Sequence, residues 1–157
     1  MKSLLHFSAV LLLLFIGISC SNSDDNNSST PITVTFSSSL APPSGVTSSA
    51  SGSATLKLNQ TAKTFEITVS YSGLTPTHGH IHAADGSIVI PFSDASVSTS
   101  PFTVTGSITS AQMAELLINH YYVNLHTTAY PNGEISGTLI KTGTSGGDGG
   151  GGGGGGY

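Results

Sequence analysis

Arginine and tryptophan are absent from this chain, and charged residues make up only 8% of its 157 residues. Beyond Lys2 there are three lysines against eight acidic residues, a formal net charge of −5. A chain so poor in basic residues offers no basic patch for nucleic acid and no polybasic segment for anionic lipid. We therefore expect neither nucleic acid nor a charged membrane surface as a partner.

Cysteine occurs once, at Cys20, so no disulfide can form within the chain. Residues 9–18 before it form an apolar run that is shorter than the roughly 20 apolar residues a membrane span needs. Such a run next to the N-terminus is typical of a secretory signal peptide, here residues 1–19. An ordinary signal peptide would leave Cys20 as a free thiol, which is unusual in an exported protein.

Residues 17–20 resemble a bacterial lipobox. The resemblance implies cleavage before Cys20, a thioether-linked lipid on its thiol, and acylation of the new amine with a fatty acid such as palmitate. Acidic residues in the following segment, 20–30, resemble the surface-export signal of Bacteroidetes-type lipoproteins. The chain is therefore predicted to be an outer-membrane lipoprotein of the bacterial cell envelope, exposed at the surface and attached through its lipid alone.

Composition divides the rest of the chain into three parts. Residues 20–30 are polar and cannot bury enough apolar surface to fold, so they are predicted to be a flexible tether. Residues 143–157 are rich in glycine and are predicted to be a disordered tail. Between them, residues 31–142 form one domain that is long enough to bury a core without disulfides.

Within that domain, apolar and polar residues alternate with the period of a β-strand. The alternation and the intervening turn signals predict about eight short strands, at 32–36, 52–59, 65–71, 77–82, 88–92, 102–107, 121–127 and 134–140. One helix is predicted at 109–118, capped by Thr109 or Ser110, and Asn132-Gly133 predicts a tight hairpin. The fold class is therefore all-β, an antiparallel β-sandwich or Greek-key barrel.

Three histidines stand at alternating positions in the strand 77–82. In an extended strand His78, His80 and His82 share one face, opposite Ile81. In the strand 121–127, Val123 and Leu125 are the expected core residues, so Tyr122, Asn124 and His126 share the other face.

If these two strands are neighbours, His80, His82 and His126 converge on one patch with His78 at its edge. Neutral imidazoles in this arrangement are suited to Zn²⁺ or Cu²⁺. A structural role is the alternative, in which each ring donates an N–H to a backbone carbonyl and ties a loop to a strand. The pattern is similar to that of copper–zinc superoxide dismutase, but that enzyme's bridging histidine and disulfide have no counterpart here, so we predict no dismutase activity.

Other polar residues do not combine into a catalytic group. Glu134 is predicted to be an exposed strand residue, with a hydrogen bond to one of the histidines as the alternative. Asp85 and Asp94 are expected to form turns, and His120 to be solvated or to cap a helix end. No serine lies in a nucleophile elbow. We therefore predict that the chain is not an enzyme.

Several motifs occur together in order: Tyr71-Ser72-Gly73-Leu74, His80-Ile81-His82, the segment 122–127 and the segment 131–139. Together they resemble the CHRD domain, first named in chordin, over residues 32–140. The resemblance implies an immunoglobulin-like β-sandwich. Since no catalytic group is recognised, we predict a non-enzymatic binding or structural role, with a copper- or zinc-binding envelope protein that uses the histidine cluster as the alternative. The family usually carries arginine where this chain has Ser136, so an anion contact by that arginine is not expected here.

Overall fold

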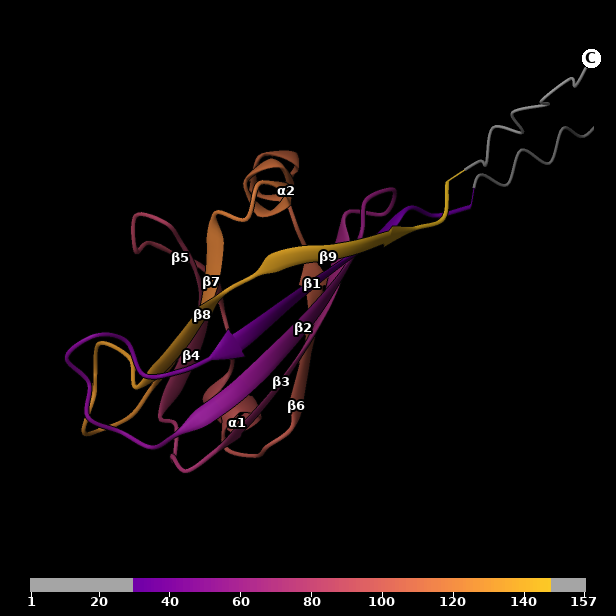
Figure 1. Cartoon of the computed structure of the whole chain (residues 1–157). Helices are drawn as coiled ribbons and strands as arrows, with labels where there is room; N and C mark the ends of the chain where they lie inside the picture. The colour runs from indigo at the N-terminus through magenta and orange to yellow at the C-terminus, as the bar shows by residue number, and fades with distance from the viewer. Residues whose placement is uncertain (1–29, 148–157) are drawn as a thin grey trace, which may run out of the picture.

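A computed structural model describes residues 30–147, which fold into two antiparallel sheets packed face to face (Figure 1). The predicted signal peptide 1–19, Cys20, and most of the tether and tail lie outside these residues. One sheet has the strand order β6-β3-β2-β1-β9 and the other β5-β4-β7-β8. The strands are β1 Thr33–Leu40, β2 Ser51–Asn59, β3 Thr64–Ser72, β4 His78–Ala83, β5 Ile88–Pro91, β6 Phe102–Ser107, β7 Tyr121–His126, β8 Ile135–Thr138 and β9 Ile140–Ser145. The predicted all-β sandwich is confirmed.

The hairpin of β2 and β3 shows how residue alternation builds the core. Leu56 lies opposite Ile67 in the antiparallel register, and both side chains are buried between the sheets. Their neighbours in sequence are polar and face solvent on the outer side of the sheet. Burying one face of each strand against the other sheet removes apolar surface from water and supplies the main driving force for this fold.

Strands β4 and β7 are the two central strands of the smaller sheet, and they pair in an antiparallel register. Ile81 lies opposite Val123, and these residues and Leu125 face the core with 0% exposure. The opposite face of the same two strands therefore carries the histidines, as the alternation predicted. This register positions the candidate site.

The predicted last strand, 134–140, is in fact divided between the two sheets. β8 pairs with β7, whereas β9 pairs with β1 in the larger sheet, and the buried Leu139 lies between them. Residues 30–147 therefore contain nine strands. β9 also continues past the predicted domain end at Thr142, because Thr33 and Val34 of β1 pair with the backbone as far as Ser145. Backbone pairing of this kind produces no apolar–polar alternation in a sequence rich in glycine and threonine, so the strand was not predicted to extend this far.

Two helices connect the strands. The predicted helix is confirmed as α2, Ser110–Leu117, which begins at a capping box formed by Thr109 and Gln112. It ends at Leu117 with Ile118 as the C-cap, and the following Asn119 has the positive φ of 62° and the backbone hydrogen bond to Leu116 that are typical of a helix C-terminus. A second helix, α1, Asp94–Val97, lies in a segment predicted to be a loop. Such a short helix has too few residues for a periodic signal.

The two ends of the described chain lie together. The backbone N–H of Gly147 donates to the carbonyl of Thr30 at 3.1 Å. In Figure 1 both ends leave the sandwich at the same corner, while the loops 41–50 and 127–134 lie at the opposite end. The sandwich therefore has one end that holds its termini and another that is built from loops.

Gly79 lies between two of the histidines, on the core face of β4. Substitution at this position tests how tightly β4 packs against the core. A Cβ atom at this position would lie 2.8 Å from Leu125 and 3.0 Å from both Phe92 and Val97. We expect Gly79→Ala to lower the free energy of unfolding by about 1–3 kcal/mol through overpacking, measured by urea denaturation. Gly143→Ala is the matched control, because a Cβ there meets nothing within 4 Å. Equal stability of the two variants would contradict this packing.

Candidate metal centre

Three histidine rings converge on the outer face of the smaller sheet. The ring centroids of His80 and His126 are 5.0 Å apart, those of His80 and His82 are 5.2 Å apart, and those of His82 and His126 are 5.7 Å apart. One ring nitrogen from each residue lies within 4.8 Å of those from the other two. His82 and His126 are buried and His80 is half-buried. The structure thus brings together the three residues that the strand pattern placed on one face.

Backbone carbonyls fix the protonation of two of these rings. Nδ1 of His82 lies 2.9 Å from the carbonyl oxygen of Gly86, and Nδ1 of His126 lies 3.0 Å from that of Pro131. Since a carbonyl oxygen only accepts, each Nδ1 must carry the proton and donate it. The lone pair of each neutral ring is then on Nε2. Both bonds tie a loop to a strand, as the structural alternative expected.

The Nε2 atoms of these two rings have different surroundings. Nε2 of His126 lies 3.1 Å from Nδ1 of His80, which must donate because Nε2 of His126 holds a lone pair. Nε2 of His82 is buried and has no hydrogen-bond partner among residues 30–147. A buried acceptor without a partner costs about 1–3 kcal/mol relative to water. This nitrogen is the one atom of the cluster for which hydrogen bonding gives no account.

The spacing of the nitrogens suits a tetrahedral ion. Two nitrogens bound to zinc at 2.0–2.1 Å with a tetrahedral angle lie about 3.3 Å apart. The observed distance from His80 Nδ1 to His126 Nε2 is 3.1 Å. This pair is therefore spaced as in such a site, and both rings would have to turn so that their lone pairs point to a common ion rather than along this hydrogen bond.

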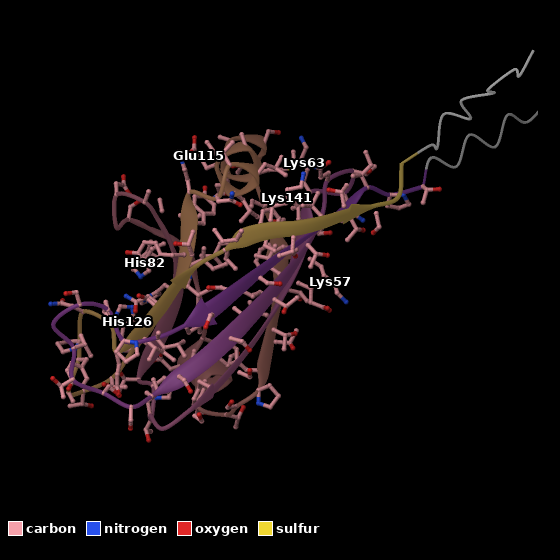
Figure 2. The ribbon with its side chains drawn as sticks, viewed as in Figure 1. Lys57, Lys63, His82, Glu115, His126 and Lys141 are labelled. Atoms are coloured by element: carbon pink, nitrogen blue, oxygen red, sulfur yellow. The ribbon has the colours of Figure 1, made fainter. Side chains whose placement is uncertain are left out.

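Burial and neighbouring charges favour the neutral form of His80 and His126. Burial lowers the pKa of His80 below its ordinary value, and the neighbouring His126, His82 and His78 lower it further, against a small opposing effect of Asp94. Burial also lowers the pKa of His126, and its bond to Pro131 partly offsets that effect. In Figure 2 the labelled lysines lie well away from His82 and His126. Neutral imidazoles are the form that binds metal ions.

Tyr122 supports the cluster from the neighbouring strand. Its ring stacks on that of His82, with centroids 5.2 Å apart and an interplanar angle of 14°. Tyr122 lies directly opposite His82 in the register of β4 and β7. The alternation placed Tyr122 on this face but gave it no role. Its stacking and the Gly86 carbonyl together hold the His82 ring in one orientation.

His78 and Asp94 lie beside the cluster. His78 is on the same face of β4, and its Nδ1 lies 2.8 Å from Oδ1 of Asp94. The predicted position of His78 at the edge of the patch agrees with its exposed side chain.

The two aspartates that were expected to form turns differ in their structure. Asp94 stands in the first turn of α1, whereas Asp85 forms the predicted turn by accepting from the backbone N–H and hydroxyl of Ser87.

Glu134 differs from both of its predicted roles. It is buried, and its carboxylate accepts hydrogen bonds from Ser48 at 2.7 Å and Thr127 at 2.6 Å, not from a histidine. Tyr130 makes a further link between the same two loops by donating to the carbonyl of Thr47. Glu134 is buried because the loop 41–50 folds over it, a contact between segments 86 residues apart. It therefore joins the loops beside the site.

Asn132-Gly133 does not form the predicted two-residue hairpin. β7 and β8 are antiparallel neighbours, but the whole loop 127–134 joins them. Gly133 has a φ of +119°, and a Cβ there would collide with the side-chain amide of Asn124. The wider loop brings the Pro131 carbonyl back to His126.

These features define an antiparallel β-sandwich with a histidine cluster on the outer face of one sheet. The model of the CHRD domain family matches residues 32–139, and the chain belongs to this family, as its motifs indicated. CHRD is not a known family of enzymes. Neither the search of curated proteins nor that of solved structures found a match. Of the helices within residues 30–147, none is both long and apolar enough to cross a membrane.

The lowered pKa values of His80 and His126 predict a pH dependence of stability. The unfolded chain binds protons at about pH 6.5, whereas the folded chain takes them up only at lower pH. Stability of the metal-free protein is therefore full above about pH 6.5 and falls as the pH drops toward the folded values. We expect thermal melts in chelator to show a lower Tm at pH 5 than at pH 7.5. A His80→Ala/His126→Ala variant should lose part of this difference, and an unchanged difference would contradict the assignment.

Proposed function

We propose that this protein is a lipid-anchored CHRD protein of the bacterial envelope that binds one Zn²⁺ or Cu²⁺ ion through His80, His82 and His126. The observation that carries the proposal is the buried Nε2 of His82, which has a lone pair and no hydrogen-bond partner within residues 30–147. A metal ion beside the other two rings would accept that lone pair.

A purely structural role accounts for less of the geometry. It explains why His82 and His126 donate from Nδ1 to the carbonyls of Gly86 and Pro131. It gives no reason to gather three histidine rings in a half-buried cluster, where His126 and His82 lower the pKa of His80 and His82 lowers the pKa of His126. Carbonyl acceptors on the outer nitrogen are also the usual support of metal-bound histidines. Metal binding therefore explains both nitrogens of His82 and both nitrogens of His126.

The donor set favours zinc or copper over other ions. Three neutral imidazole nitrogens suit Zn²⁺ and copper, whereas Mg²⁺ and Ca²⁺ require oxygen ligands. For His80 to bind through Nδ1, its proton must move to Nε2, and coordination then replaces its hydrogen bond to His126. The rings of His82 and His126 need no change of tautomer. The site is thus largely prepared for an ion.

Titration calorimetry of the mature chain from residue 21 tests the proposal. We expect one Zn²⁺ or Cu²⁺ per chain with a dissociation constant on the order of 1 µM or tighter. The His80→Ala/His126→Ala variant should bind at least about 100-fold more weakly, because two of the three donors are gone. His120→Ala is the control, since His120 is exposed and bonds to Glu115 away from the cluster. Binding weaker than about 1 mM, or unchanged in the double variant, would falsify the metal site.

The lipid anchor has its own test. Cys20 follows an apolar segment that resembles a lipoprotein signal, and it is the chain's sole thiol. We expect the wild-type protein to fractionate with membranes and Cys20→Ala to appear in the soluble fraction. Cys20→Ala protein that stays in the membrane fraction would contradict anchoring through this residue.

A further inference from the structure

A fourth histidine on this face repeats the pattern of the others. Nδ1 of His78 is bound to an oxygen, as are Nδ1 of His82 and Nδ1 of His126. Its acceptor is the carboxylate of Asp94, at 2.8 Å, rather than a backbone carbonyl. In its neutral form His78 therefore also holds its lone pair on Nε2. A carboxylate on the outer nitrogen is a common support of metal-bound histidine.

The register places His78 next to the cluster. It lies two residues before His80 on the same face of β4, and directly opposite His126 on β7. Side chains directly opposite each other in an antiparallel pair have Cβ atoms about 4.5–5.5 Å apart. All four rings thus share one patch of two strands.

His78 has to turn to reach the other three. Its ring lies outside the group of nitrogens that fall within 4.8 Å of one another. Its side chain is 56% exposed and that of Asp94 is 71% exposed, so neither is held by packing. A fourth ligand at this position requires the two side chains to rotate together, so that Nε2 of His78 turns toward the cluster while Nδ1 keeps its acceptor.

We propose that His78 supplies the fourth ligand of the metal ion through Nε2, with Asp94 as its hydrogen-bond acceptor, so that four imidazoles enclose the ion. The inference rests on the proposed function of the three buried histidines. It also specifies that function, because four protein ligands leave no position for water or substrate, as in sites that hold a metal rather than use it in catalysis. The exposed His78 would then be the last of the four histidines to bind the ion.

Zinc affinity and ligand number test this inference on the mature chain from residue 21. The Zn²⁺ dissociation constant is measured by competition with a chromophoric chelator, and the number of imidazoles by zinc X-ray absorption. We expect four imidazoles in the wild type and three in His78→Ala, with an affinity about 10–100-fold lower. Asp94→Ala should keep four imidazoles and bind about tenfold more weakly.

The chain offers a matched control pair. His120 and Glu115 form the same Nδ1–carboxylate bond at 2.8 Å, with similar exposures of 53% and 52%. His120→Ala and Glu115→Ala should therefore leave both readouts unchanged. Melts of the metal-free variants check folding, and no loss is expected at these exposed positions.

The outcomes separate the two proposals. Three imidazoles and equal affinity in the wild type and in His78→Ala would overturn the fourth ligand and leave the three-histidine site standing. An Asp94→Ala protein that behaves like Glu115→Ala would overturn the supporting role of Asp94. A wild type that binds neither Zn²⁺ nor Cu²⁺ would overturn the proposed function together with this inference.

Discussion

The backbone pairing of β4 with β7 is the constraint on which the site depends. Ile81 lies opposite Val123, and their side chains fill the core from the same side of the sheet. Because successive side chains of a strand point to opposite faces, a slip of one residue would bury the histidines and expose the core. The energy of apolar burial therefore holds the polar face in place. The histidine cluster has its geometry because Ile81 and Val123 cannot leave the core, whatever the cluster itself contributes.

Alternation in the sequence was enough to predict the sandwich and the face on which the histidines lie. It failed where tertiary pairing decides the structure. The segment 134–140 reads as one strand, yet Leu139 is buried between two strands that belong to different sheets. α1 is too short to show a helical period and depends on the cap of Ser93 and the burial of Val97. Periodicity reports which residues are buried, but not which sheet a strand joins.

The sequence was enough to predict the three histidines of the candidate site, but not the groups that accept their hydrogen bonds. His80, His82 and His126 stand out by residue type and spacing. Their acceptors at Gly86 and Pro131 are backbone oxygens, which every residue has, so the sequence carries no signal for them. Glu134 was misplaced for a related reason, since its burial comes from the loop 41–50, distant in sequence. Loop closure over a sheet is a tertiary event, and it sets the tautomers of His82 and His126 on which the proposed metal binding depends.

The two ends of the described chain meet at one corner of the sandwich, where Gly147 bonds to Thr30. The histidines lie on a sheet face away from that corner (Figure 2). For a chain held at Cys20, the tether would approach the domain from the end that contains its termini. Under the proposed anchoring, the cluster would then lie on a part of the domain away from the lipid, and a metal ion could reach it without passing the anchor.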